Sequence, residues 1–495
     1  MLILSPIMKS PRNFITGSIA KNFLYISSSL ITALLSLLIP WYYAIPLLIF
    51  VLSGFLLCIK FQYGLYILIF LVPIAGRTVG FAVSAPWNPV FRDASPINQI
   101  SVFFPFALFA FCGLIISKWT RIREYPKNHL NFILILLLFY ATLSLLWAPD
   151  FKHNFFQLAL LSSNMAIFAI AFNTISDQNM HKKVMFFFLF CGMFYSFIAV
   201  ILYFIEPLVL VKSIRLFEDF SLNLKIFTSA ITKKGFIKRA SLIANSNESA
   251  LILNLYISIA TGLLFTAKKR LTQLLLAILI AALVSLSLLT MSRGGEVGLI
   301  AMGIFIFGAI IRIRKYFVVL SILFLFVLIS IYQLEFFVLN RILFSRDKPT
   351  RLATTVKSKE VQGVGIRLEF WKAGFKSMKK SPLSGAGVGV GSFKYYTLVN
   401  HAHNIYLSLI FDFGIAGVLF LFFIARFVLY EFSTVFKNQS SYFQIMSVAF
   451  LAGLVSIGVH GLVDFEYNTP FIWLYSGLAV STINFAKQEI IQASC

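Results

Sequence analysis

Two histidines and an asparagine stand directly before a long apolar segment in "HAHNIYLSLIFDFGIAG", residues 401–417. Asn404 is suited to cap the helix that the apolar residues predict, which leaves His401 and His403 just outside the N-terminal end of that helix. Histidine titrates near neutral pH and often serves as a general base. The stretch therefore predicts a group that removes a proton from a hydroxyl.

Two arginines lie in motifs next to apolar runs. "LTMSRGGEV" (289–297) separates two hydrophobic stretches and puts Arg293 at a membrane boundary, beside two glycines that allow close backbone approach. "RLEFW" (367–371) contributes Arg367 and Trp371. Because the guanidinium fork matches phosphate oxygens, such arginines are suited to hold an anionic substrate such as a diphosphate. The alternative for Arg293 is a side chain that snorkels to the membrane surface and caps a helix.

Two more polar motifs stand at the ends of predicted helices. "GVHGLVDFEYNTP" (458–470) carries His460 and Asp464, and Asn247 belongs to an asparagine-rich helix start. Each residue has a structural alternative, since asparagine and aspartate commonly cap helices and a lone histidine on a helix commonly serves packing. Asp464 is equally suited to orient a histidine.

Neither a metal nor a nucleotide cofactor is predicted. A single H-x-H pattern without a second closely spaced ligand pair does not indicate a metal site. The alternating glycines of "GAGVGVG" (385–391) follow a basic, proline-broken segment, and no Rossmann-type helix follows them. This turn leaves two readings open, which are backbone N–H groups that approach a phosphate or an ordinary flexible loop.

The elements that position these motifs are membrane helices. Of the 495 residues, 59% are hydrophobic and 12% charged, and the apolar residues form blocks near the length that spans a bilayer. We therefore expect an all-α fold, a polytopic transmembrane helix bundle of about 12–14 spans with two extended external loops. The four cysteines are scattered and indicate no disulfide. The candidate spans are 22–39, 41–59, 63–80, 100–117, 130–147, 157–174, 184–205, 248–266, 271–290, 295–311, 316–338, 404–425, 443–463 and 470–486.

The formal charge of +24 is distributed in a way that predicts the topology. Alternate short loops are basic, for example "HKK" (181–183) and "AKKR" (267–270), and the positive-inside rule puts them and both termini in the cytoplasm. The N-terminal apolar run is expected to remain as an uncleaved helix. Two long basic connections, 206–247 and 339–402, then lie outside, where they bind lipid headgroups or an anionic substrate.

Taken in order, these motifs resemble the O-antigen ligase and polymerase family of bacterial envelope glycosyltransferases. The likeness covers roughly residues 240–480 and rests on the order and spacing of the motifs. The residues before 240 match the family only in being hydrophobic helices. The motifs are the asparagine-rich start at 245–248, "SRG" at 292–294, "RLEFW", "SPLSGAGVGVGSF", the His-Asn of "HAHNIYLSLIFDFGIAG", and "HGLVDFEYNTP".

The resemblance implies an enzyme that accepts a glycan linked to undecaprenyl diphosphate at the periplasmic face of the inner membrane. By matching position, His403 would activate the acceptor hydroxyl, and Arg293 and Arg367 would hold the diphosphate, without a metal, a nucleotide sugar or nucleic acid. The acceptor would be lipid A-core in a ligase or a second lipid-linked glycan in a polymerase. The candidates for supporting roles are His401, Asn404, Asp464, His460, Asn247 and Trp371.

The domain organisation follows from the same comparison. We expect N-terminal transmembrane helices and the first basic loop in 1–240, a catalytic region in 241–486 that includes the loop 339–402, and a cytoplasmic tail in 487–495.

Several functions remain open at this level. Ligase and polymerase share donor and chemistry, and the arrangement of one long external loop before a helix pair favours a ligase. A protein O-oligosaccharyltransferase belongs to the same class. A polysaccharide or lipid transporter would place ionisable residues near the middle of the bilayer and use paired repeats, neither of which the sequence indicates. A noncatalytic scaffold would account for the basic loops but not for the order of the motifs.

Overall fold

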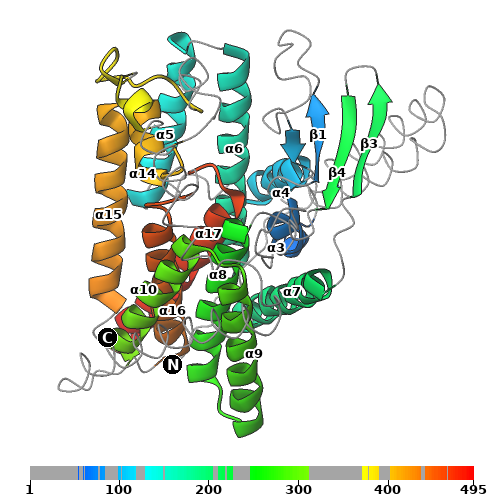
Figure 1. Cartoon of the computed structure of the whole chain (residues 1–495). Helices are drawn as coiled ribbons and strands as arrows, with labels where there is room; N and C mark the ends of the chain where they lie inside the picture. Colours follow the sequence, from blue (N-terminus) through cyan, green and yellow to red (C-terminus); the bar gives the residue numbers. More distant parts are fainter. Residues whose placement is uncertain are drawn as a thin grey trace, which may run out of the picture.

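The chain forms a bundle of long apolar helices with a small antiparallel sheet at one side (Figure 1). The computed structural model describes residues 54, 60, 62–75, 79–83, 99–101, 103–118, 129–148, 151–204, 210–217, 220–226, 246–310, 371–376, 378–389, 402–435, 441–464 and 467–494. Predicted spans 22–39 and 316–338, and all of 41–59 except residue 54, lie outside these residues.

The described helices confirm the predicted helical membrane bundle. Five of them are long and apolar enough to cross a membrane, with segments Asn154–Thr174, Gln178–Ile201, Ser246–Thr266, Arg270–Leu289 and Tyr442–His460. The helices are α3 (Gln62–Ala75), α4 (Phe103–Lys118), α5 (His129–Leu143), the 3₁₀ turn η4 (Ser144–Leu146), α6 (Phe151–Thr174), α7 (Gln178–Phe204), α8 (Ser246–Thr266), α9 (Arg270–Leu289), α10 (Arg293–Ile310), α14 (Ile405–Phe413), α15 (Ile415–Val435), α16 (Tyr442–His460) and α17 (Pro470–Ser494).

Helix α9 illustrates why these segments suit a bilayer. Leu271, Leu274, Leu275 and Ile278 recur at helical spacing and are exposed, whereas Leu283 on the inner side is buried. An exposed leucine stripe of this kind would be costly in water and is favourable against lipid tails.

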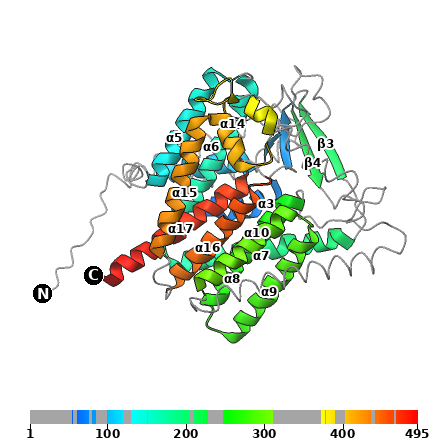
Figure 2. The same ribbon diagram turned by 60° about the vertical axis from the view of Figure 1, so that its left-hand side comes forward.

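Helices α8, α10 and α16 lie side by side in the core of the bundle (Figure 2). Small residues bring their backbones close together, as is usual between membrane helices. A Cβ atom added to Gly298 of α10 would meet Ser456 of α16, and one added to Gly295 would meet Ala250 of α8. The glycines after Arg293 therefore serve helix packing.

Hydrogen bonds between helix ends define the two ends of the bundle. His181, near the start of α7, bonds to Tyr442 at the start of α16 and to Thr482 in α17. Asn247, at the start of α8, bonds to Asp464, which follows the end of α16. We refer to these as the His181 end and the Asp464 end. Since α16 has 19 residues, they are about 28 Å apart, close to the thickness of the hydrocarbon core.

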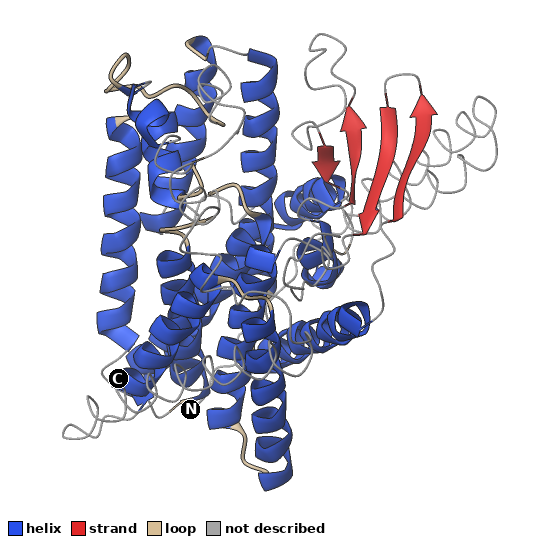
Figure 3. Ribbon diagram, in the orientation of Figure 1, coloured by secondary structure: helices blue, strands red, loops and turns tan. Residues whose placement is uncertain are grey.

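The sheet is an addition to the predicted fold (Figure 3). Its strands are β1 (Val79–Val83), β2 (Gln99–Ser101), β3 (Leu210–Phe217) and β4 (Phe220–Ile226), in the order β2-β1-β4-β3 with antiparallel neighbours. The last two strands fall in the connection 206–247. "FSLNLKI" in β4 alternates apolar and polar residues, the pattern of a strand, which an analysis by long apolar runs passes over.

The predicted span 404–425 is wrong as a single helix, because it divides at Gly414 into α14 and α15. Gly414 has φ 58° and ψ −134°, and a Cβ atom there would lie 2.6 Å from the carbonyl oxygen of Pro382. The Ile415 N–H donates to this same oxygen at 3.1 Å. In an unbroken helix it would instead donate to the carbonyl four residues earlier in the chain. A loop from elsewhere in the chain thus ends α14.

Candidate active site

His403 is positioned by the segment that leads into α14. Its φ of 49° is left-handed, an uncommon conformation for a residue with a side chain. The next residue, Asn404, caps α14 as the sequence predicts, since its Oδ1 accepts from Leu407 N–H at 2.9 Å. Its amide Nδ2 donates to the carbonyl of Leu462 at 2.8 Å. One asparagine therefore both starts α14 and fastens His403 to the turn after α16.

The imidazole of His403 is hydrogen-bonded to a carboxylate in that turn. Its Nδ1 lies 3.0 Å from Oδ1 of Asp464, and the side chains are 29% and 11% exposed. The amide of Asn247 donates to the other oxygen, Oδ2. A chain of contacts thus runs from the start of α8 through Asp464 to His403. With the carboxylate on Nδ1, the neutral ring carries its proton there, and Nε2 is the basic nitrogen.

Arg293 begins α10 at the same end of the bundle. Ser292 caps this helix, with its Oγ accepting from Gly295 N–H at 3.2 Å. A Cβ atom on Gly294 would collide with the imidazole of His460, so the ring lies directly against the residue after the arginine. Asp464 N–H donates to the carbonyl of His460 at 3.2 Å. The exposed arginine and the His403 pair therefore flank one turn of chain.

Trp371 supports the approach to His403 from a different segment. Its indole N–H donates to the carbonyl of Ala402 at 2.9 Å, one residue before His403. The helical residues 371–376 also pack on α14, since a Cβ atom on Gly374 would collide with the ring of Phe411. Trp371 is therefore coupled to the backbone at His403.

A buried polar network behind Arg293 was not predicted from sequence. Asn254 of α8 is fully buried, and its Nδ2 donates to the carbonyl of Gly295 at 2.8 Å and to Oγ of Ser456 at 3.2 Å. Its Oδ1 accepts from the hydroxyl of Ser287 at 3.0 Å. One amide thus joins α8, α9, α10 and α16 beneath the first turn of α10. A lone asparagine within the apolar "ALILNLYISIA" was the available signal.

The glycine-rich segment is a structural clamp, which differs from both readings that the sequence left open. Gly385, Gly387 and Gly389 have φ of 69°, 98° and 88°, conformations that favour glycine. Successive N–H groups donate to protein acceptors rather than standing ready for a phosphate. These bonds are Ala386 to Phe411 O at 3.0 Å, Gly387 to Asp412 O at 2.9 Å, Val388 to Ser144 Oγ at 3.0 Å and Gly389 to Asp412 Oδ2 at 2.8 Å.

Asp412 is the buried centre of this clamp. Its carboxylate accepts from Gly389 N–H and, at 2.6 Å, from the hydroxyl of Tyr467, whose segment follows the Asp464 turn. Asn154 of α6 donates to Val388 O at 2.5 Å on the other side. The clamp therefore ties the end of α14 to α6 and to the chain that leads into α17, which fixes the helix that carries His403 at its start.

The structure brings most of the expected site residues together at the Asp464 end. Arg367 and His401 lie outside the described residues. Within the part of the chain that is described, no three His, Cys, Asp or Glu side chains form a group that could hold a metal ion. The residues that gather around the turn after α16 are His403, Asn404, Asp464, His460, Asn247, Arg293 and Trp371.

Comparison with known proteins finds a similarity in the central part of the chain. Residues 278–422 match the model of a family described as O-antigen ligase, and among curated proteins none matches the chain. The matched residues include Arg293, Arg367 and His403, whereas Asn247 and Asp464 fall outside them. The match supports glycan transfer of the ligase or polymerase type, with lipid-linked substrates, by a multi-pass membrane protein. Residues 278–422 are therefore similar to the O-antigen ligase family.

Proposed function

We propose that this protein transfers a glycan from undecaprenyl diphosphate to a sugar hydroxyl of lipid A-core, with His403 as the general base. The observation that carries the proposal is the 3.0 Å contact between His403 Nδ1 and Asp464 Oδ1. A carboxylate that fixes the tautomer and orientation of an imidazole is the arrangement that general-base catalysis requires. Asn247 would hold the carboxylate in place, since it donates to the second oxygen.

The proposed reaction is a displacement at the anomeric carbon of the donor glycan. The acceptor hydroxyl gives its proton to Nε2 of His403 as its oxygen bonds to that carbon. The bond between the anomeric carbon and the diphosphate oxygen breaks on the opposite side, and the leaving diphosphate keeps the electron pair. Positioning two large lipid-linked substrates in this line contributes to the rate by itself.

Arg293 and Arg367 would stabilise the departing diphosphate. Negative charge develops on its oxygens, and fixed guanidinium groups in a partly dry site lower the energy of that transition state. The proposed role of Arg293 is supported by its position as the first residue of α10, because a helix N-terminus also favours anions. Arg367 stands four residues before Trp371 in the sequence, and Trp371 contacts the residue before His403.

The same proposal assigns the Asp464 end to the periplasm and the His181 end to the cytoplasm of a bacterium, within the inner membrane. It is supported by the basic residues 181–183, in the first two turns of α7, and 267–270, between α8 and the start of α9. Both groups belong to the His181 end, as the positive-inside rule expects of a cytoplasmic face. Both termini would then be cytoplasmic. We retain the division into an N-terminal part, 1–240, a catalytic part, 241–486, and a short tail, 487–495, as part of this proposal.

The acceptor decides between a ligase and a polymerase. Purified protein would be incubated with undecaprenyl-diphosphate glycan and, separately, with lipid A-core or a second lipid-linked repeat, without added metal or nucleotide. We expect the glycan on lipid A-core. Longer lipid-linked chains with no transfer to lipid A-core would instead assign a polymerase, and inactivity of wild-type protein with both acceptors would contradict the proposed function.

A further inference from the structure

A second candidate site lies at the opposite end of the molecule. The first turns of α3 and α7 border a cavity of about 730 Å³, within the size range of ligand-binding pockets. Because α7 starts at the His181 end, this cavity is separated from the His403 contacts by about the length of α16. It is therefore distinct from the site proposed for glycan transfer. The residues that line it are Lys60, Gln62, Tyr63, Tyr66, Asp177, Asn179, Met180 and Lys183.

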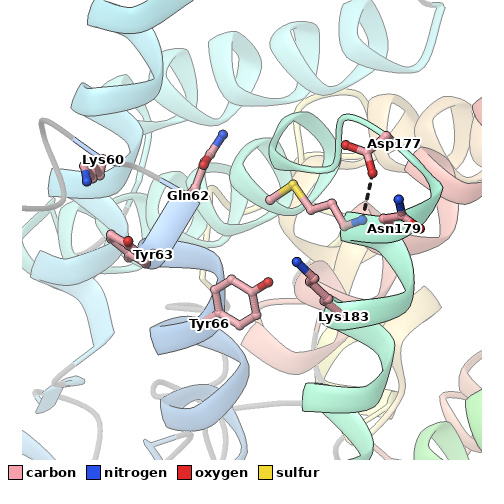
Figure 4. A pocket seen from close by; sticks show the side chains of 8 residues that line it. Lys60, Gln62, Tyr63, Tyr66, Asp177, Asn179 and Lys183 are labelled. Carbon is pink, nitrogen blue, oxygen red and sulfur yellow. Dashed lines mark hydrogen bonds between the residues drawn. The ribbon is translucent and has the colours of Figure 1, made fainter.

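The lining of the cavity combines two ammonium groups with neutral hydrogen-bonding groups (Figure 4). Lys60 precedes α3, and Lys183 lies in the second turn of α7. In Figure 4 the Lys183 ammonium and the Tyr66 hydroxyl both lie between the two helices. Tyrosine hydroxyls and side-chain amides can donate to phosphate oxygens, and the N-termini of the two helices add positive potential.

The one carboxylate in the lining is already engaged in capping α7. Oδ1 of Asp177 accepts from Met180 N–H at 2.9 Å, and Oδ2 accepts from the Ser176 hydroxyl at 2.8 Å. The Met180 N–H bond, followed by that of Ser176, lowers the pKa of Asp177 below its usual value, so the group stays ionised. Two lysines against one capped carboxylate leave the cavity with net positive charge.

We propose that this cavity binds the phosphate of an anionic phospholipid headgroup. A lipid is favoured over a soluble anion because both helices that border the cavity continue into apolar, surface-exposed segments, such as Phe70 of α3 and Phe190 of α7. Tyr63, at the mouth, is half exposed, as expected of an aromatic ring at the headgroup level. Basic pockets between helix ends on the cytoplasmic side are suited to such headgroups.

The test compares two double variants that lose the same charge. Lys60→Gln with Lys183→Gln changes the cavity, whereas Lys268→Gln with Lys269→Gln removes two lysines from the α8–α9 turn at the same end of the bundle. The full chain would be placed in nanodiscs of phosphatidylcholine with a minor share of phosphatidylglycerol. Native mass spectrometry would then give the ratio of bound phosphatidylglycerol to bound phosphatidylcholine.

We expect the cavity variant to lose most of the preference for phosphatidylglycerol, by about fivefold for each lysine and about 30-fold for both. Lys268→Gln with Lys269→Gln should keep the preference for phosphatidylglycerol. Lys60→Arg with Lys183→Arg should keep it as well, because both charges remain, and this would exclude misfolding as the cause of the loss. An equal loss in the two glutamine variants would overturn the proposal, because the preference would then follow overall charge. Removal of the preference by millimolar inorganic phosphate would assign the cavity to a soluble anion and overturn the lipid assignment.

Discussion

At the scale of single residues, the candidate site depends on contacts that span long stretches of sequence. Asp464 is 61 residues from His403 and 217 from Asn247, and each residue alone has an ordinary reading as a cap or a loop residue. The order of the motifs could suggest that they belong to one site. Only the three-dimensional structure shows that the Asp464 carboxylate contacts Nδ1 of His403. The sequence predicted that Asn404 caps α14, but it could not show that the same side chain also binds the carbonyl of Leu462 after α16.

If Asp464 orients His403, Asp464→Asn should lower the turnover number while leaving the KM for the lipid-linked donor unchanged. The turnover number should fall at least about tenfold and by no more than the 10²–10⁴-fold that a general base itself contributes. Asp464→Glu should recover part of it, because the carboxylate is kept. Steady-state kinetics of the purified variants would measure both constants. A rise in KM with an unchanged turnover number would instead assign Asp464 to donor binding.

Asn254 is expected to matter for stability, because it is the shared partner of groups on three other helices. Asn254→Ala would leave the Ser287 hydroxyl and the Ser456 hydroxyl without this buried partner and should lower the free energy of unfolding by about 1–3 kcal/mol. Thermal unfolding in detergent would detect this as a lower Tm. The matched variant is Thr261→Val in the same helix. The Thr261 hydroxyl donates to the carbonyl of Ile257 within that helix, and among the described residues it joins no other helix. Equal Tm values for the two variants would contradict the role of the network.

At the scale of elements, sequence patterns predicted helices well where the pattern was a long apolar run. Helix α8 covers the predicted span 248–266, and α9 covers nearly all of 271–290. The break at Gly414 was missed because "IFDFGIAGVLF" is apolar on both sides of Gly414 except for Asp412. The cause of the break is a loop that starts more than 30 residues earlier. The strands were missed because their alternation is short. A hydropathy pattern thus predicts which segments lie in lipid. It does not predict where a distant carbonyl, such as that of Pro382, replaces a helix carbonyl as the acceptor of a backbone N–H.

Position 414, at the break between α14 and α15, should accept no residue other than glycine. Gly414→Ala would force a side chain into a left-handed conformation and toward Pro382 O, and should cost at least about 1–3 kcal/mol of stability. Gly458→Ala in α16 is the matched variant, since its Cβ would meet only the Tyr406 hydroxyl, at 3.2 Å. We expect a lower Tm and reduced transfer for the first variant and near-native values for the second. Native stability of Gly414→Ala would show that the clamp is not rigid.

At the scale of the whole molecule, the basic residues next to the helices predict which helix ends share a membrane face, and the assignment of those faces stays a prediction. The bonds of His181 and of Asp464 support the predicted alternation for α7, α8, α16 and α17. The packing between them was not predictable, since it depends on which small residues face which helix. Gly262 against Ala449 is one such contact, and the sequence contains many apolar positions that would have served as well.

Labelling with a membrane-impermeant maleimide would test the orientation of the two ends. In a background in which the four native cysteines are replaced, Val463→Cys at the Asp464 end should react from the periplasmic side. Lys269→Cys, in the turn between α8 and α9, should react only after the membrane is opened. Both side chains are exposed in the structure, so accessibility depends on the side of the membrane. Labelling of both from the same side would contradict the proposed topology.

The most direct test of the central claim is the rate of glycan transfer by His403→Ala, measured with saturating undecaprenyl-diphosphate glycan and lipid A-core. His401→Ala, the other histidine of the same segment, is the matched variant. If His403 is the general base, its loss should lower the rate by about 10²–10⁴-fold, with donor affinity retained, whereas His401→Ala should stay within a few fold of wild type. Transfer by His403→Ala at the wild-type rate would contradict the account.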